Sequence, residues 1–387
     1  MKTPPGNAMG GSFIMRIAAA TVYTKALPLR DPFQHASSGL ITHLHEVYLR
    51  LATDEGAEGF GEVRGNAHYV TGDTPARIVA VLCDVLCPLV AGADPLQLGA
   101  IMDRCDRAIH GNSAAKAVAD IALHDLVGHL LNVPACVLLG GRRHDRLATD
   151  TSIPFCPPEA AAAQAREYLD AGFGVLKVRV GLRPFARDRE RVEAVWATLQ
   201  AHPRRGDAAI AVDTNQGWTV KEAIRNLRAL ERYPLAWAEQ PIAAGDIPGL
   251  AEVRRQIAVP IVADEACKGP EELQWIVRLQ AADIVHLKLL KTGGMARMRE
   301  MMAIAEAAGI GVMVGQMDEG RVATAAAVQC AAAARAASGE LWGFQRVAED
   351  VATGIEMRDG HMLVPAGPGL GVRVDESKLE KVAEVRA

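Results

Sequence analysis

The stretch AAIAVDTNQGWTVKEAIRNLRALERYPLAWAEQPIAAGDIPGLAEVRRQIAVPIVADEA, residues 208–266, decides the fold. Three short apolar runs, 208–213, 235–240 and 261–266, alternate in it with longer amphipathic segments. The apolar runs have the length of buried strands, and the segments between them have the apolar spacing of helices. A repeated order of strand then helix predicts a parallel sheet whose strands are connected by helices.

The same alternation continues on both sides of this stretch and gives eight strands in all. Each strand except the last is followed by a helical pattern, which predicts a (β/α)8-type barrel. A doubly wound sheet is the alternative, but it usually opens on a glycine-rich turn, and none follows the first strand. The remaining predicted strands are 151–156, 175–180, 284–289, 311–316 and 340–344.

The residues outside the barrel predict a second, α+β unit. Residues 41–62 alternate as a hairpin that turns at 54–56, and helical patterns follow at 75–89 and 112–131. The glycine-rich, extended end of the chain is expected to return to this first unit. The expected divisions are a tail at 1–14, the α+β domain at 15–145, the barrel at 146–350 and the returning segment at 351–387.

Composition excludes several classes of protein. The chain has 387 residues, a net charge of −4 and a pI of about 6.3, so nucleic acid and anionic membranes are not expected partners. No apolar run has the length of a membrane span, and the first sixteen residues lack the apolar core of a signal peptide. The seven cysteines are scattered without a Cys-x-x-Cys pair, which favours a reduced, cytoplasmic protein over a disulfide framework or a zinc site.

Three acidic residues lie at the ends of consecutive predicted strands. Asp213, Glu239 and Asp264 are 26 and 25 residues apart, which is one strand-and-helix unit each time. Barrel enzymes carry their chemistry at these strand ends. Converging carboxylates repel one another unless a cation lies between them, and oxygen ligands suit Mg²⁺, with Mn²⁺ as a substitute. The alternative is that each acid caps the helix after it.

Cations flank this group of acids from two sides. Lys177 and Arg179 share one face of the second strand, and Lys288 lies on the sixth strand, across the barrel. This arrangement predicts a bound anion, with lysine as general base, because arginine does not readily lose its proton. We expect Lys291 to extend along the barrel rim towards solvent, and His286, one layer deeper than Lys288, to serve packing.

The motifs in their order and spacing resemble the muconate lactonizing enzyme subgroup of the enolase superfamily. The resemblance covers nearly the whole chain after Met15. It implies Mg²⁺ on Asp213, Glu239 and Asp264, acid/base lysines on strands two and six, and a first domain that caps the barrel mouth. The motifs are KAVADIALHDLVGHLLNVPACVLLGG (116–141), LKVRVG (176–181), DTNQGWT (213–219), AEQP (238–241), ADEA (263–266), LKLLKTGG (287–294), GQMDEG (315–320) and PGLGV (368–372).

The implied activity is removal of the α-proton of a small carboxylate to give a metal-stabilised ene-diolate. The leading interpretation is an isomerase, either a cycloisomerase or a racemase/epimerase, in a homo-oligomer. An acid dehydratase of the same superfamily is the alternative. A metal-binding barrel without catalysis is the alternative from another class.

Two departures from the subgroup's pattern affect this interpretation. Arg179 stands where the second lysine of Lys-x-Lys is usual, so either Lys177 takes that role or Lys288 works alone while Arg179 steadies negative charge. Strand eight carries Trp342 and Phe344 in place of the Asp-x-Asp of dipeptide epimerases, which disfavours dipeptides. The seventh strand lacks the histidine of the mandelate racemase subgroup.

Further residues are assigned to supporting roles. Glu319 is expected to bond the carboxylate of the intermediate, or else to begin the next helix. Asn215 and Gln240 are expected to support the metal ligands. The predicted substrate contacts are Phe33, His35, Asn66, Tyr69, Asp318, Trp342 and Phe344.

Overall fold

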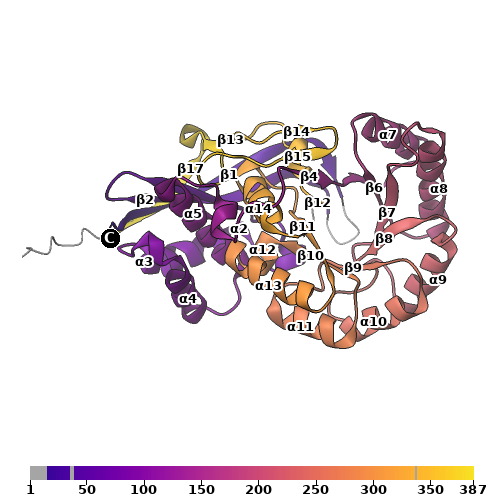
Figure 1. Ribbon diagram of the computed structural model, residues 1–387, viewed down its shortest axis with the longest axis horizontal. Helices are drawn as coiled ribbons and strands as arrows, with labels where there is room; N and C mark the ends of the chain where they lie inside the picture. Colours follow the sequence, from indigo (N-terminus) through magenta and orange to yellow (C-terminus); the bar gives the residue numbers. More distant parts are fainter. Residues whose placement is uncertain (1–14, 35–38, 336–337) are drawn as a thin grey trace, which may run out of the picture.

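The structure is a computed structural model that describes residues 15–34, 39–335 and 338–387. The expected tail, 1–14, and the predicted substrate contact His35 lie outside these residues. Figure 1 shows the barrel on the right and the N-terminal domain on the left, with the C-terminal segment running back over both.

The predicted barrel is confirmed. Its parallel strands form one sheet that closes on itself, because β4 pairs with β12 and β5 pairs with β6, and Asp150 alone separates β4 from β5. In the order in which they pair, the strands are β4 (Arg146–Thr149) with β5 (Thr151–Ile153), β6 (Val175–Arg179), β7 (Ala209–Asp213), β8 (Leu235–Glu239), β9 (Ile261–Ala263), β10 (Ile284–Lys288), β11 (Gly311–Gly315) and β12 (Ser338–Glu340).

Helices follow the strands as predicted and surround the barrel. The arc from α7 to α11 forms the outer wall at the right of Figure 1. Their amphipathic sequences explain this placement, since one face packs on the sheet and the other meets water. They are α7 (Pro158–Asp170), α8 (Phe185–Ala201), α9 (Val220–Leu230), α10 (Ile247–Gln256), α11 (Pro270–Leu279), the short α12 (Leu289–Thr292), α13 (Met295–Ala307) and α14 (Arg321–Ala333).

The first and the last barrel strands differ in position from the prediction, while the strands between them differ at their ends. The first strand begins at Arg146 rather than at residue 151, and the eighth ends at Glu340, where it was predicted to begin. The chain after Glu340 turns into a 3-10 helix, η3 (Gly343–Arg346), because Trp342 already has helical backbone angles. Trp342 and Phe344 therefore lie beyond the strand and not on it.

The N-terminal domain is an antiparallel sheet covered by helices. Its strands are β1 (Ile17–Phe33), β2 (Ile41–Thr53) and β3 (Glu58–Arg64), and the β2–β3 hairpin is the one that the alternation predicted. Helix α5 (Ser113–Leu131) packs directly on β3. A Cβ at Gly61 would lie 2.1 Å from the backbone oxygen of Val118, so glycine is required for this close approach.

Smaller helices complete this domain. They are α1 (His68–Thr71), α2 (Pro75–Val81), the π-helix η1 (Leu82–Leu86), α3 (Cys87–Val90), the 3-10 helix η2 (Pro95–Gln97), α4 (Leu98–Ala108) and α6 (Ala135–Leu138). In the described part of the chain, no single helix has both the length and the apolar character to cross a bilayer. Among the described residues, one pair of neighbouring helical segments, Pro75–Val90 and Pro95–Ala108, meets these criteria when the two are counted together. The two segments are bent by 118° relative to each other.

The C-terminal segment contacts both domains. Strand β15 (His361–Leu363) adds to β4 at the barrel, and β17 (Glu380–Arg386) pairs with β1 as the outer strand of the N-terminal sheet. The rest of the segment consists of β13 (Ala352–Thr353), β14 (Met357–Arg358), β16 (Arg373–Val374) and the 3-10 helix η4 (Glu376–Lys378).

Candidate active site

A cavity lies where the carboxyl ends of the barrel strands meet the N-terminal domain. Tyr69 and Val70 form its wall on the side of the N-terminal domain, and charged residues from the barrel form most of the remainder. Six residues predicted from the sequence line it together: Tyr69, Arg179, Asn215, Asp264, Lys288 and Asp318. Its other lining residues are Val70, Glu265, Gln316, Met317 and Glu340.

The three predicted metal ligands lie at one height in the barrel. Asp213 and Glu239 are paired residues at the ends of β7 and β8, and Asp264 follows β9 directly. All three are buried, with at most 3% of each residue exposed. The parallel register therefore places one carboxylate at the end of each of three successive strands.

Each of these carboxylates is paired with a cation. Nη1 of Arg179 lies 2.5 Å from Oδ2 of Asp213, and Nζ of Lys177 lies 2.9 Å from Oε2 of Glu239. Both cations therefore point into the barrel. From the opposite side, Nζ of Lys288 lies 2.8 Å from Oδ2 of Asp264.

Burial would raise the pKa of Asp264, but the two lysines beside it, Lys288 and Lys291, outweigh burial and hold that pKa well below its usual range.

Glu340 belongs to the site, although the sequence did not reveal it. Its Oε1 lies 2.6 Å from Nζ of Lys177, and its Oε2 lies 3.5 Å from Nζ of Lys288. Burial opposes the charged form, yet these lysines keep the pKa of Glu340 well below its usual range. The predicted eighth strand began at this position, whereas β12 ends there, so the sequence pattern did not place Glu340 at the carboxyl end of a strand.

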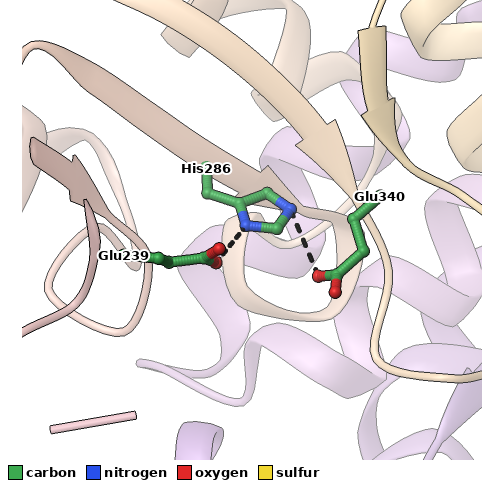
Figure 2. A group of neighbouring side chains, drawn as sticks. All are labelled: Glu239, His286 and Glu340. Carbon is green, nitrogen blue, oxygen red and sulfur yellow. Dashed lines mark hydrogen bonds and ion pairs between the residues drawn. The ribbon is translucent and has the colours of Figure 1, made fainter. Parts of the chain in front are cut away.

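His286 is more than a packing residue. Its Nδ1 lies 2.7 Å from Oε1 of Glu239, and its Nε2 lies 3.8 Å from Oε2 of Glu340. Figure 2 shows the imidazole ring between the two carboxylates. Ligand atoms of the three residues lie within 4.8 Å of one another, which is close enough for a metal ion. However, Nζ of Lys177 already bridges Glu239 and Glu340, so an ion at that point would have to displace an ammonium group.

Lys291 corrects an expectation from the sequence. It was expected to extend towards solvent, but only 2% of the residue is exposed. Its Nζ donates to both the backbone oxygen and Oδ1 of Asp264, and to the backbone oxygen of His286 at 2.8 Å. The reason is that α12 begins immediately after Lys288 and turns the side chain of Lys291 inward.

The carboxylates around the cavity are of the kind that binds a divalent cation, although Asp213, Glu239 and Asp264 do not bring three ligand atoms within 4.8 Å of one another. Oε2 of Glu265, which lines the cavity, is buried and has no hydrogen-bond partner among the described residues. Burial, together with neighbouring Asp264 and Asp213, raises the pKa of Glu265 to about 8. Burial and Glu239 raise the pKa of Asp213 to about 6 against the opposing effect of Arg179. Carboxylates that hold protons this strongly are not fully neutralised by the cations beside them, and a divalent cation with oxygen ligands would supply further positive charge.

Gln240 and Glu319 organise loops. Oε1 of Gln240 accepts from the backbone N–H groups of Asp264 at 3.0 Å and Ala266 at 2.9 Å, and so shapes the turn that carries Asp264. Glu319 accepts from the backbone N–H of Arg64, in β3, and from that of Met317, both at 3.2 Å. Glu319 does not line the cavity and instead connects the barrel to the N-terminal domain.

The other described residues predicted as substrate contacts do not line this cavity. Phe33 packs against two guanidinium groups, with Cζ of Arg64 5.8 Å and Cζ of Arg346 5.0 Å from the centre of its ring. Asn66 is held within the N-terminal domain, where it accepts from Nε of Arg64 at 2.9 Å. Trp342 lies under Arg346, whereas Phe344 is 1% exposed and faces Arg321.

Comparison with known proteins agrees with this architecture. Residues 17–140 match the family model "Mandelate racemase / muconate lactonizing enzyme, N-terminal domain". Residues 160–378 match the model "Enolase C-terminal domain-like". Together the two matches cover both structural units and most of the chain.

Three relatives show the range of activities among similar proteins. The N-succinyl-L-Arg/Lys racemase of Bacillus cereus is 34% identical over 95% of this chain and 98% of its own. Its crystal structure superposes with a TM-score of 0.90, over 96% of this chain and 100% of that one. The chloromuconate cycloisomerase of Cupriavidus pinatubonensis is 34% identical over 92% of this chain and 96% of its own. A dipeptide epimerase of Enterococcus faecalis, crystallised with Mg and the dipeptide L-Leu-L-Tyr, has a TM-score of 0.86 at 28% identity, over 92% of this chain and 99% of that one.

Proposed function

The chain belongs to the mandelate racemase / muconate lactonizing enzyme family of the enolase superfamily, and from this premise we propose that Lys288 is the base of its reaction. The protein is an enzyme, and its relatives are racemases, epimerases and cycloisomerases. Its reaction is an isomerisation that begins when the α-proton of a small carboxylate is removed. The single observation that carries the assignment of the base is the position of Lys288 in the cavity wall.

Lys288 and Lys177 differ in access to a substrate. Lys288 lines the cavity, whereas Lys177 has no exposed surface and is held between Glu239 and Glu340. The residue of the second strand that does reach the cavity is Arg179. Burial would lower the pKa of its guanidinium, but Asp213 outweighs burial and keeps the group charged. This supports a reaction with one base, in which Arg179 steadies negative charge on the opposite side.

We assign the cation to Asp213, Glu239 and Asp264, with Asn215 and Gln240 holding the surrounding loops. The three carboxylates end successive strands, and Glu265 adds an unpartnered oxygen next to Asp264. A bound divalent cation, Mg²⁺ or Mn²⁺, supplies positive charge that holds a substrate carboxylate and stabilises the charge left when a proton departs. We prefer this set to Glu239, His286 and Glu340 because its three carboxylates follow successive strands and offer oxygen ligands alone.

The ionisation of Lys288 decides when it can act. Burial would lower its pKa, but Asp264 and Glu340 outweigh burial and raise it. As a base, the side chain must reach the neutral form, so positive charge has to offset these carboxylates first. We therefore expect proton abstraction to depend on the divalent cation.

The experiment is exchange of the α-proton with solvent. The enzyme is incubated in D₂O with MgCl₂ and a library of small carboxylic acids, and deuterium at the α-carbon is followed by NMR. We expect metal-dependent exchange on one face of the substrate, with loss of exchange after chelation. Formation of 2-oxo acids would instead identify a dehydratase. If no library member exchanged while the cation was bound, the proposed function would be rejected.

A further inference from the structure

The carboxylate of Asp318 lines the cavity without a hydrogen bond of its own. Of the other acids in the wall, Asp264 and Glu340 each have an ammonium group within 3 Å, and Oε1 of Glu265 has the side-chain amide of Asn215 at 3.4 Å. Among the described residues, the Asp318 side chain forms an ion pair with Arg346, whose Nε lies 3.7 Å from Oδ1 of Asp318. A carboxylate that is only 17% exposed and has no donor is expected to bind one from elsewhere.

The turn that carries Asp318 is fixed on both sides. The backbone N–H of Glu319 donates to Oε1 of Gln316 at 2.6 Å, and Nη1 of Arg64 donates to the backbone oxygen of Met317 at 2.6 Å. Asp318 itself has a φ of 53°, in the left-handed region that few residues other than glycine adopt readily. Its side chain is therefore directed by the surrounding structure and not by its own hydrogen bonds.

Capping of the next helix does not explain Asp318. Helix α14 has Gly320 at its N-cap position and no side-chain capping bond. Asp318 thus keeps both of its carboxylate oxygens available.

Two neighbours keep this carboxylate in place. Gly343 leaves the space beside it, since a Cβ at that position would lie 2.5 Å from Oδ1 of Asp318 and 2.7 Å from Nε2 of Gln316. Arg346 supplies the counter-charge. Its Cζ lies 4.8 Å from the centre of the Trp342 ring and 5.0 Å from that of Phe33, and its guanidinium makes no hydrogen bond within the described residues. Stacking between two rings positions a guanidinium without using its donors.

We propose that Asp318 determines specificity by accepting a hydrogen bond from an N–H or O–H group that the substrate carries near its α-carbon. The substrate class is then carboxylic acids with such a donor, in particular N-acylated amino acids or hydroxy acids. Arg346 is a positioning residue that acts through Asp318. The inference rests on the proposed function, because it assumes that the substrate's carboxylate binds in the same cavity as Lys288.

The test compares ligands that differ only in the donor. N-acetyl-L-amino acids are paired with the corresponding O-acetyl-2-hydroxy acids, and 2-hydroxy acids with their deoxy counterparts. Dissociation constants are measured by calorimetry in the presence of MgCl₂. We expect the wild type to bind at least one donor-bearing member about 10- to 100-fold more tightly than its partner, the range for a hydrogen bond to a charged group. The two series distinguish an N–H from an O–H donor.

Variants assign this preference to Asp318. Asp318→Gly suits the positive φ and removes the carboxylate, and Gly343→Ala displaces the carboxylate without removing it. Both should bring the ratio of the two dissociation constants close to one, and Arg346→Lys should reduce it. The control Asp145→Asn changes an acid with a 92% exposed side chain and should leave the ratio unchanged.

The outcomes separate this inference from the proposed function. A wild type that binds no donor-bearing ligand more tightly than its partner, or a preference that survives in Asp318→Gly, overturns the inference. Exchange of the α-proton is followed with the same ligands. A donor preference that depends on Asp318, without exchange for any ligand, supports the inference and rejects Lys288 as a base.

Discussion

Nη1 of Arg179 donates to Oδ2 of Asp213 at 2.5 Å, and the same atom donates to Oδ1 of Asn215 at 2.6 Å. The arginine thus sits directly on a carboxylate that we assign to the cation, at a position where similar enzymes were expected to carry a lysine base. A guanidinium remains charged at any pH at which the protein is folded. On the side of the cavity opposite Lys288, Arg179 therefore offers positive charge and does not replace a lysine base.

Arg179→Lys should add a second base. Lysine keeps the positive charge but can lose its proton beside other cations, which arginine cannot do. We expect the wild type to exchange the α-proton of one enantiomer of its substrate, and the variant to exchange that of both. Deuterium incorporation into each enantiomer measures this. Exchange of both enantiomers by the wild type would contradict the one-base reaction.

Lys288→Met should lower the rate of α-proton exchange by about 10³-fold or more, within the range contributed by a general base. The affinity for Mn²⁺ should stay within a few-fold of wild type, since the carboxylates remain. The control is Lys221→Met, which replaces an exposed lysine of α9. Residual exchange above a few per cent of the wild-type rate would show that another group removes the proton.

The two possible sets of metal ligands predict different effects of mutation. Asp213→Asn should weaken Mn²⁺ binding by more than about 100-fold, and Glu340→Gln by less than about tenfold, because loss of a direct ligand costs more than loss of a neighbour. Binding is measured by electron paramagnetic resonance of free Mn²⁺. The reverse order would place the ion at Glu239, His286 and Glu340.

Lys291→Met should destabilise the protein although Lys291 does not contact the substrate. The ammonium group binds the backbone oxygens of Asp264 and His286 and Oδ1 of Asp264. Its removal leaves these buried acceptors without the donor that Lys291 supplies, while Lys288 still binds Oδ2 of Asp264. The expected loss in the free energy of unfolding is about 3–5 kcal/mol, as for other broken buried ion pairs. Urea denaturation measures it, and a loss below about 1 kcal/mol would contradict the prediction.

Glu46→Gln should change how stability depends on pH. Both carboxylate oxygens of Glu46 are buried without a partner among the described residues, and burial and Glu62 raise its pKa well above the usual 4.5. Burial and Asp350 also raise the pKa of Glu62, to about 8. The folded state thus holds protons that the unfolded state has already lost, so stability falls as the pH rises from about 4.5 towards 8.

Removing one of these carboxyl groups should reduce that slope by up to about 1.4 kcal/mol per pH unit. Glu46→Gln should therefore be more stable than the wild type at pH 8 and similar to it near pH 4.5. Thermal unfolding at a series of pH values tests this. Parallel curves for the two proteins would show that Glu46 does not titrate as described.

The sequence was most informative where one structural unit repeats. The strand ends Asp213 and Glu239 were predictable because a barrel repeats one strand and one helix about every 25 residues, and the register then aligns the ends. Glu340 was missed because β12 has only three residues, so its hydrophobic pattern does not define where it ends. The ends of a strand this short are set by its pairing with neighbouring strands, here β11 and β4, and the spacing of residues in the sequence does not reveal that pairing.

Contacts between residues that are distant in the chain could also not be predicted from the sequence pattern. His286 was expected to serve packing, and its partner Glu239 is 47 residues earlier in the chain. Lys291 was expected at the rim because a lysine usually extends towards water, and only the inward turn of α12 reverses this. In both cases, the role of the side chain is set by groups that the fold brings close to it: the carboxylate of Glu239 for His286, and two backbone oxygens and the carboxylate of Asp264 for Lys291.

The pairing of β17 with β1 has a consequence for synthesis of the protein. Strand β17 contains residues 380–386, so the N-terminal sheet gains this strand only after all the barrel strands have been synthesised. Translation proceeds at about 5–20 residues per second, and β1 waits for its partner during this time. A nascent chain stalled before residue 380 would expose the edge of β1 to pairing with other chains.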